Sequence, residues 1–129
     1  MPGKKKAVIK GNELRDNVIE LAKKLKLEYR KEVRAGRRIY GKKRKIDVVL
    51  RHPGTGKVLG IECKFQDTPG TAEEKIVATI EDIKHWPIHG IVVIAGKGFS
   101  SEMIGYLMST GKVVTFQDLE DWLKLYFNL

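Results

Sequence analysis

Residues 57–66 read K-V-L-G-I-E-C-K-F-Q, and the alternation within this stretch decides the fold of the chain. Side chains of a strand point alternately to its two faces, so Glu62, Lys64 and Gln66 share one face. The residues between them are apolar or, like Cys63, small and easily buried. A row of polar groups on an otherwise buried strand needs a partner, and the neighbouring strand is the place for it.

The partner is expected on residues 46–51, I-D-V-V-L-R, whose β-branched residues predict a second strand. The turn-forming residues H-P-G-T-G at 52–56 join the two strands into an antiparallel hairpin. Such a hairpin brings Asp47 alongside Glu62 on the same face, with Lys64 one pleat further along, ~7 Å from Glu62. The apolar side chains of the second strand are expected on the face opposite Asp47, namely Ile46, Val48 and Leu50.

The order of the elements follows from the hydrophobic spacing and the turn residues on either side of the hairpin. The predicted elements are a helix over 12–27, strands over 29–39, 46–51 and 57–66, a helix from 71 that ends before Pro87, a strand over 90–95, a helix over 100–108, a strand over 113–115 and a closing helix from 116. Three antiparallel strands, a crossover helix and a buried fourth strand predict an α/β fold with a mixed central sheet flanked by helices. Residues 1–10 are expected to form a flexible basic arm, and residues 11–129 a single domain.

The composition narrows the class of protein. No apolar stretch approaches the ~18 residues of a membrane span, and the Lys-rich start lacks the apolar segment of a secretory signal. The single cysteine excludes an internal disulfide and a zinc site built from cysteines. We therefore expect an intracellular, cytoplasmic protein without membrane association, and leave open whether a cell, a phage or a virus encodes it.

Positive charge is concentrated in the first part of the chain. Residues 1–51 hold 18 of the 25 Lys and Arg but only 6 of the 16 Asp and Glu, within a net charge of +9. A basic region of this kind favours a polyanion as partner, because neutralising phosphates releases condensed counterions. Nucleic acid is the expected partner, and a well-solvated basic surface is the alternative.

Two acids at one point of a sheet indicate a metal. Carboxylates held together repel each other, which costs stability unless a cation lies between Asp47 and Glu62. Mg2+ prefers oxygen ligands and keeps several waters that a phosphate can displace. Beside the acids, the Lys64 ammonium can stabilise charge on a phosphoryl oxygen or orient an activated water. These are the requirements of phosphodiester hydrolysis, whereas a cross-strand ion-pair network without chemistry is the alternative.

Asp47, followed by Glu62-x-Lys64 on the next strand, with a helix before and a helix and strand after, resembles the PD-(D/E)xK nuclease superfamily. This superfamily includes restriction endonucleases and archaeal Holliday junction resolvases. The resemblance covers residues 12–95, and Gln66 extends it to the E-x-K-x-Q form of the motif. It implies a restriction-endonuclease-like αβββαβ core.

The resemblance also implies cleavage of DNA with Mg2+, for which Mn2+ is expected to substitute, and no small-molecule cofactor. The metal would be bound by Asp47, Glu62 and the main-chain carbonyl of Cys63. By the same resemblance, Lys64 serves the attacking water and Gln66 orients water or phosphate.

Many relatives place a further acid on the first helix, about four residues after a glycine. Counting from Gly11, that position is Arg15, which cannot bind a metal. Glu13 and Glu20 lie two helical turns apart, so either could lean over the sheet edge. We favour Glu13 as the additional catalytic acid because it lies in the first turn; solvated surface acids at both positions are the alternative.

Residues 30–45 are rich in Arg and Lys and predict a basic hairpin that lies on the phosphate backbone of DNA. The expected phosphate contacts are Arg34, Arg37, Arg38, Lys42, Lys43, Arg44 and Lys45. Lys75, near the start of the crossover helix, is expected to touch phosphate as well. A solvated ribbon and ordinary surface charge are the alternatives.

The sequence as a whole predicts a Mg2+-dependent endodeoxyribonuclease that selects DNA structure, or sequence only weakly, since it contains no recognition helix or added domain. A domain of this size has room for one active site, so cutting both strands requires a symmetric homodimer. The expected contact is the closing helix at Trp122, Tyr126 and Phe127. A nuclease-fold module that binds DNA without cutting it, and RNA as the substrate, are left as alternatives.

Overall fold

The computed structural model describes the backbone of residues 2–37, 43–67 and 72–129, and the side chains of residues 10–36, 43–67 and 75–129. The helices and strands follow one another along the chain in the order that the sequence predicts. In chain order they are α1 (Pro2–Lys24), β1 (Glu28–Arg37), β2 (Lys43–Arg51), β3 (Val58–Phe65), α2 (Ala72–Ile83), β4 (Gly90–Ala95), α3 (Ser101–Ser109), β5 (Val113–Thr115) and α4 (Phe116–Phe127).

The five strands form one mixed sheet in the order β1-β2-β3-β4-β5. β1, β2 and β3 form an antiparallel meander, whereas β4 runs parallel to β3 and β5 runs parallel to β4. The chain passes from β3 to β4 through α2, because a parallel pair needs a crossover connection. The predicted α/β fold with a mixed central sheet is confirmed.

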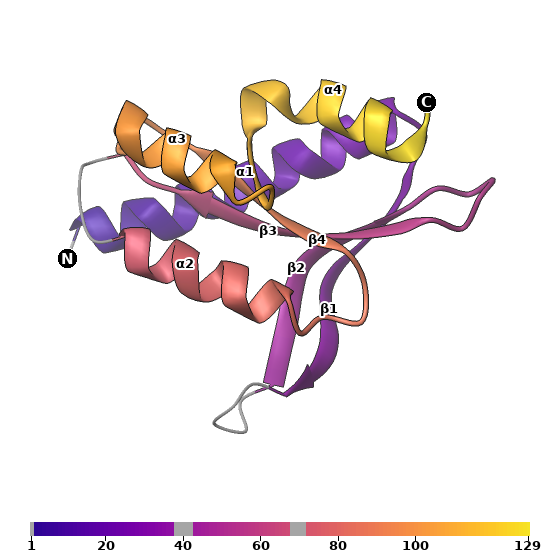
Figure 1. Cartoon of the computed structure of the whole chain (residues 1–129), viewed down its shortest axis with the longest axis horizontal. Helices are drawn as coiled ribbons and strands as arrows, with labels where there is room; N and C mark the ends of the chain where they lie inside the picture. Colours follow the sequence, from indigo (N-terminus) through magenta and orange to yellow (C-terminus); the bar gives the residue numbers. More distant parts are fainter. Residues whose placement is uncertain (1, 38–42, 68–71) are drawn as a thin grey trace.

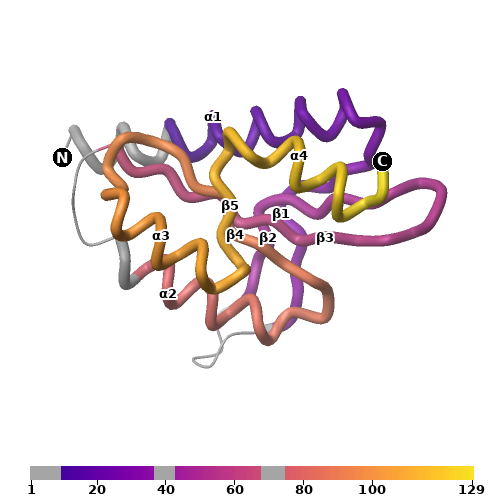
Figure 2. The backbone as a smooth tube through the Cα atoms, turned by 45° about the horizontal axis from the view of Figure 1, so that its top comes forward, coloured from indigo at the N-terminus to yellow at the C-terminus, as the bar shows by residue number. Residues whose placement is uncertain are grey.

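Helices cover both faces of the sheet, which gives the molecule three layers (Figure 1). Figure 2 shows α1 and α4 on one side of the strands and α2 and α3 on the other. The side chains of β4 alternate between the two apolar clusters that result: Ile91 and Val93 pack under α1 and α4, and Val92 and Ile94 pack under α2 and α3. A strand covered on both faces has no polar side, which explains its unbroken apolar run.

β1 and β2 continue beyond the other strands as a twisted two-stranded ribbon (Figure 1). The ladder between β1 and β2 skips Glu32 and Asp47, which lie between the pairs Lys31–Val48 and Val33–Ile46, and two-stranded ribbons twist more strongly than wide sheets. As a result β2 changes sides, because Val48 and Leu50 pack under α1 and α4 whereas Ile46 packs under α2 and α3. The prediction that these three side chains share one face is therefore wrong for Ile46.

α1 begins at Pro2, so the backbone of residues 2–10 is helical where the sequence predicted a flexible basic arm. Lys and Ala are good helix formers, and a nucleated helix adds further residues readily. Leu14, Val18 and Ala22 face the sheet from this helix at the predicted spacing. None of the helices in the described part of the chain combines the length and apolar character needed to cross a membrane.

Two glycines on adjacent strands make room for one large side chain. The ring of Trp86, just after α2, lies over Gly60 of β3 and Gly90 of β4, which are paired across the sheet. A Cβ atom added at Gly60 would lie 2.6 Å from this ring, and one at Gly90 would lie 2.4 Å from it. These two glycines therefore fix how the end of α2 sits on the sheet.

Candidate active site

The ladder between β2 and β3 opens at Asp47 and Glu62. Backbone pairing extends as far as Val48 and Ile61. At the next position side chains take over: the Asp47 amide donates to Glu62 Oε1 at 3.2 Å, and the Cys63 amide donates to Asp47 Oδ2 at 2.9 Å. Each carboxylate is held by the main chain of the opposite strand, and both occupy the same gap in the sheet.

This gap brings together two acids, of which Glu62 is buried and Asp47 is half-buried. Glu62 is only 7% exposed. Burial and, after it, the Asp47 carboxylate raise the pKa of Glu62 to about 8, whereas the Lys64 ammonium lowers it. Without a cation, the site therefore holds a proton at neutral pH. A cation between the two carboxylates would allow both of them to ionise.

Cys63 contributes its backbone rather than its thiol. Burial, followed by the charges of Asp47 and Glu62, raises the pKa of the thiol, which packs among apolar residues under α1. In an antiparallel ladder, one residue directs its N–H and its C=O toward the same neighbouring strand. Because the Cys63 amide donates to Asp47, its carbonyl faces the same gap.

The groups that face the gap are oxygen ligands. They are the carboxylates of Asp47 and Glu62 and the Cys63 carbonyl; among the described side chains, no three or more of Asp, Glu, His and Cys converge on one point. Such a small set of hard oxygen donors fits Mg2+, which uses one or two carboxylates and keeps several waters. It does not fit a structural zinc ion, which takes four ligands that are mainly nitrogen and sulfur.

Lys64 connects the acids to an open groove. It lies two residues after Glu62 on β3 and lines a cavity of about 500 Å3 between the sheet and α2. Arg44 of β2 and Lys75 and Asp82 of α2 also line this cavity. The groove therefore reaches the Lys64 side chain, which lies two residues from Glu62 on the same strand.

Gln66 holds a loop against the end of β3. It is 8% exposed, and its Nε2 donates to the Gly98 carbonyl at 2.9 Å. Its amide donates to the Ala95 carbonyl at 3.0 Å, and its own carbonyl accepts the Gly98 amide at 2.7 Å. The Oε1 atom is buried without a hydrogen-bond partner in the described chain. This leaves one buried acceptor for a water molecule.

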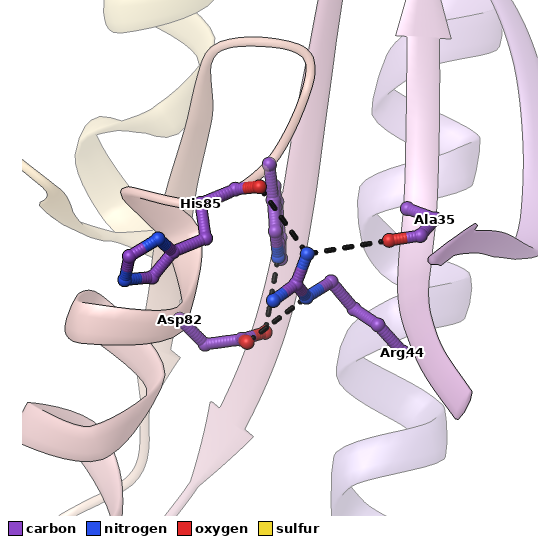
Figure 3. A network of polar contacts seen from close by, with 5 residues as sticks. Ala35, Arg44, Asp82 and His85 are labelled. Atoms are coloured by element: carbon purple, nitrogen blue, oxygen red, sulfur yellow. Dashed lines mark hydrogen bonds and ion pairs between the residues drawn. The ribbon is translucent and has the colours of Figure 1, made fainter. Parts of the chain in front are cut away.

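Arg44 is 8% exposed and joins three parts of the structure (Figure 3). Its Nε donates to Asp82 Oδ1 at 2.9 Å, and its Nη1 donates to the carbonyls of Ala35 at 3.3 Å and His85 at 3.2 Å. The Trp86 indole donates to Asp82 Oδ2 at 3.1 Å. The prediction of a phosphate contact is wrong for Arg44, because its guanidinium holds the β1–β2 ribbon against α2.

Of the other predicted phosphate contacts, some are exposed side chains and some lie outside the described residues. Arg34, Lys43 and Lys45 are exposed on the ribbon, and Lys75 is exposed on α2 at the groove. Arg38 and Lys42 lie outside the described residues, and for Arg37 only the backbone, at the end of β1, is described.

The acids of α1 lie apart from the gap. Glu13 is exposed and pairs with Lys10 at 3.3 Å, and Glu20 is exposed and pairs with Lys23 at 3.2 Å. The structure does not bring either of them to the pair of acids on β2 and β3.

Arg15 occupies the helix position where relatives place an acid. Its Nη1 lies 3.7 Å from Glu32 Oε1 on β1, and its Nε is buried without a hydrogen-bond partner within the described residues. Glu32 has φ of +49°, and the residues on either side of it pair with the residues on either side of Asp47. The first helix thus presents a cation, paired to β1, near the open end of the ladder.

The aromatic side chains of α4 pack against other parts of the same chain. Phe127 is 2% exposed in the cluster under α1 and α4, and the partly buried Trp122 and Tyr126 pack against it. The rings of Trp122 and Tyr126 stack 5.1 Å apart, and the Tyr126 hydroxyl donates to the Val58 carbonyl at 3.0 Å. The predicted dimer contact is wrong for Phe127, because this side chain is part of the core.

Of the α2 residues that line the groove, the sequence predicted Lys75 but not Thr79 or Asp82. Lys75, Thr79 and Asp82 follow one another at spacings of four and three residues, which places them on one side of a helix beside its apolar stripe. This spacing was the available signal. Arg44 and Asp82 lie 38 residues apart in the chain, so no local pattern in the sequence indicated their contact.

Comparisons with known proteins agree with this arrangement. The family model for the PD-(D/E)XK nuclease superfamily domain matches residues 5–122. A comparison with curated proteins gives no match. Among solved structures, the crystal structure of AF1548, a protein of unknown function, is similar with a TM-score of 0.54 and 23% sequence identity. That similarity covers 79% of this chain and 56% of the other, and it concerns the fold.

Proposed function

Because the chain belongs to the PD-(D/E)XK nuclease superfamily, we propose that it is a Mg2+-dependent endonuclease that hydrolyses phosphodiester bonds of DNA. The observation that carries the proposal is the pair of carboxylates, Asp47 and Glu62, in the gap between β2 and β3. Two acids that can hold a metal, with the Lys64 amine beside them, are the groups that phosphodiester hydrolysis needs.

Mg2+ would be held by Asp47, Glu62 and the Cys63 carbonyl, and Mn2+, which accepts the same oxygen ligands, is expected to substitute. When bound, the ion makes a coordinated water more acidic and offsets negative charge on the phosphate. The raised pKa of Glu62 supports this assignment, since the buried pair is short of positive charge without a cation.

Lys64 and Gln66 complete the proposed site. The Lys64 ammonium, at the mouth of the groove, donates to the phosphoryl oxygen on which charge develops and keeps the attacking water in place. Gln66 Oε1 accepts a hydrogen bond from a water, while its Nε2 stays on the Gly98 carbonyl. Glu13 is left out of the site because its carboxylate pairs with Lys10.

DNA is proposed as the substrate from the charge of the β1–β2 ribbon. Arg34, Lys43 and Lys45 are exposed there and can contact the phosphate backbone. Phosphate contacts carry no sequence information directly, so we propose selectivity for DNA structure, or weak selectivity for sequence. Cutting both strands with one site per chain then requires a symmetric homodimer. Sedimentation should give twice the chain mass of 14.6 kDa.

A second candidate function is a nuclease-fold module that binds DNA without cutting it. The observation in its favour is that the helix position of the further acid is Arg15, and that Glu13 and Glu20 lie apart from the gap. In this case the same basic ribbon holds DNA for another protein.

Cleavage of a supercoiled plasmid, with Mg2+, with Mn2+ and with a chelator, separates the two candidates. The enzyme should cut in either metal and not with the chelator. Lys64→Ala should lower kcat by about 10²–10³, as loss of one donor to developing charge does, and Asp47→Asn should abolish cutting. Lys124→Ala, which removes an exposed charge from α4, is the matched control and should cut like the wild type.

Wild-type protein that binds the plasmid but leaves it intact in both metals would support the binding module. The same assay on duplex, flap, single-stranded and four-way DNA, with an RNA competitor at one fixed salt concentration, identifies the preferred substrate.

A further inference from the structure

The groove beside Lys64 has an unusual balance of charge. It lies between β2–β3 and α2, has a volume of about 500 Å3, and is lined by both acidic and basic side chains. Its acids are Glu81 and Asp82, and its bases include Lys64 and Lys75. Which of these charges remain uncompensated decides what the groove can bind.

Both acids of the groove already have cations. Asp82 Oδ1 accepts from Arg44 at 2.9 Å, and Asp82 Oδ2 accepts from the Trp86 indole at 3.1 Å. Glu81 pairs at 2.7 Å with Lys84, the residue that directly follows α2. The wall formed by Arg44 and Asp82 is therefore close to neutral.

The two lysines remain as the net charge of the groove. Within the described residues, neither Lys64 nor Lys75 has an ion-pair partner within 4.0 Å. Thr79 lies between Lys75 and Asp82 on α2, and its hydroxyl donates a hydrogen bond to the Lys75 carbonyl at 2.8 Å. Two ammonium groups that line one cavity favour an anion inside it.

Lys64 also belongs to the acid site, since it lies two residues after Glu62 on the same face of β3. The groove therefore begins where the chemistry takes place and leads from there along α2. A chain of phosphates whose reacting member lies at Asp47 and Glu62 would bring its next member into this groove.

We propose that the groove binds the DNA phosphate next to the one that is cut, with Lys75 as its main contact and Lys64 shared by the two phosphates. The identity of the ligand rests on the proposed nuclease function. Lys75 is then a substrate-binding residue, and Arg44 and Asp82 form the neutral floor against which the strand lies.

The first test measures binding of a DNA duplex by fluorescence anisotropy at several salt concentrations, with a chelator present so that cleavage plays no part. Lys75→Ala should reduce the slope of log affinity against log salt by about 0.9, the value for one phosphate contact. Lys84→Ala removes a lysine that directly follows α2 and is already paired with Glu81, and it should leave the slope unchanged. Equal slopes for the two variants would overturn the proposal.

The second test uses duplexes that each carry one uncharged methylphosphonate linkage. For the wild type, one linkage beside the cut position should weaken binding, because the charge that Lys75 meets is gone. For Lys75→Ala the same linkage should have no effect, whereas Lys84→Ala should behave like the wild type. A linkage that weakens all three proteins equally would place the contact elsewhere and overturn the proposal.

These measurements separate the groove from the nuclease function. Absence of cleavage in Mg2+ and Mn2+, with the Lys75-dependent salt slope intact, would refute the enzyme and keep the groove as a phosphate site. If the wild type cleaves DNA but Lys75→Ala binds it as the wild type does, the nuclease function stands and the phosphate site in the groove is refuted. Because Lys75 is exposed, its replacement should leave the thermal midpoint unchanged, which checks that the variant folds.

Discussion

The main-chain amide of Asp47 donates to Glu62 Oε1 at 3.2 Å, so the acid of one strand is held by the backbone of the other. The Asp47 carboxylate is held in the same way by the Cys63 amide at 2.9 Å. These bonds replace ladder hydrogen bonds at the point where β2 and β3 separate. The sheet thus orders two carboxyl groups side by side without metal, and the cost of ionising both of them can be measured.

The first prediction concerns the pH dependence of stability without metal. Because the pKa of Glu62 is raised from 4.5 to about 8 in the folded protein, its contribution to stability is fully present below about pH 4.5 and is lost as pH rises through about 8. Urea unfolding across this range should show the decline in the wild type. Glu62→Gln should flatten it, whereas Glu20→Gln, an exposed acid of α1, should not. If the free energy of unfolding of Glu62→Gln falls with rising pH as steeply as that of the wild type, other groups cause the decline.

The second prediction concerns the metal. A cation that binds the two carboxylates must displace the proton from Glu62, so Mg2+ should raise the thermal midpoint more at about pH 8 than at about pH 6. Calorimetry in buffers of different ionisation enthalpy should detect the released proton. Asp47→Asn should remove the shift. A shift that persists in this variant, or that shrinks as pH rises, would speak against metal binding in the gap.

Much of this arrangement followed from the sequence because it depends on local signals. Alternation in β3, the turn residues before it and the apolar run of β4 each report on their own strand, and together they predict the sheet. The position of Asp47 beside Glu62 followed from the hairpin alone. Ser100, the first residue of the helix predicted over 100–108, accepts the Met103 amide at 3.1 Å and caps α3.

What the sequence could not predict depends on contacts between distant elements. Arg44 stands among exposed Arg and Lys and has the same local pattern as they do, yet the end of α2 buries it. Ile46 alternates correctly with Val48, but the twist of the ribbon turns it to the other layer. For Phe127 a local signal was available, because it follows Leu119 and Leu123 at spacings of four residues on the buried side of α4.

The third prediction tests the role of Arg44. Removing one partner of a buried ion pair leaves the other charge unpaired, so Arg44→Ala should lower the free energy of unfolding by about 3–5 kcal/mol. Its exposed neighbour provides the control, since Lys45→Ala should change it by no more than about 0.5 kcal/mol. The double variant Arg44→Leu, Asp82→Leu should lose less than the sum of its two single variants, because it leaves neither charge behind. Strictly additive losses would show that the pair does not act as a unit.

The last prediction compares two glycines, Gly90 and Gly105, whose surroundings in the fold differ. A Cβ atom at Gly90 would lie 2.4 Å from the Trp86 ring, whereas one at Gly105, within α3, would meet nothing within 4 Å. Gly90→Ala should therefore destabilise the protein by about 1–3 kcal/mol through overpacking, and Gly105→Ala should stabilise it by about 0.5–1 kcal/mol by lowering the entropy of the unfolded chain.

Trp86 is the direct cause of the difference, and a double-variant cycle can show this. In a Trp86→Leu background the ring is gone, so Gly90→Ala should cost much less than in the wild type, while the gain from Gly105→Ala should stay the same because α3 is remote from the ring contact. Urea unfolding of the six proteins gives all the free energies. If Gly90→Ala costs as much without the ring as with it, the glycine is required by the backbone of β4 and not by the packing of α2 on the sheet.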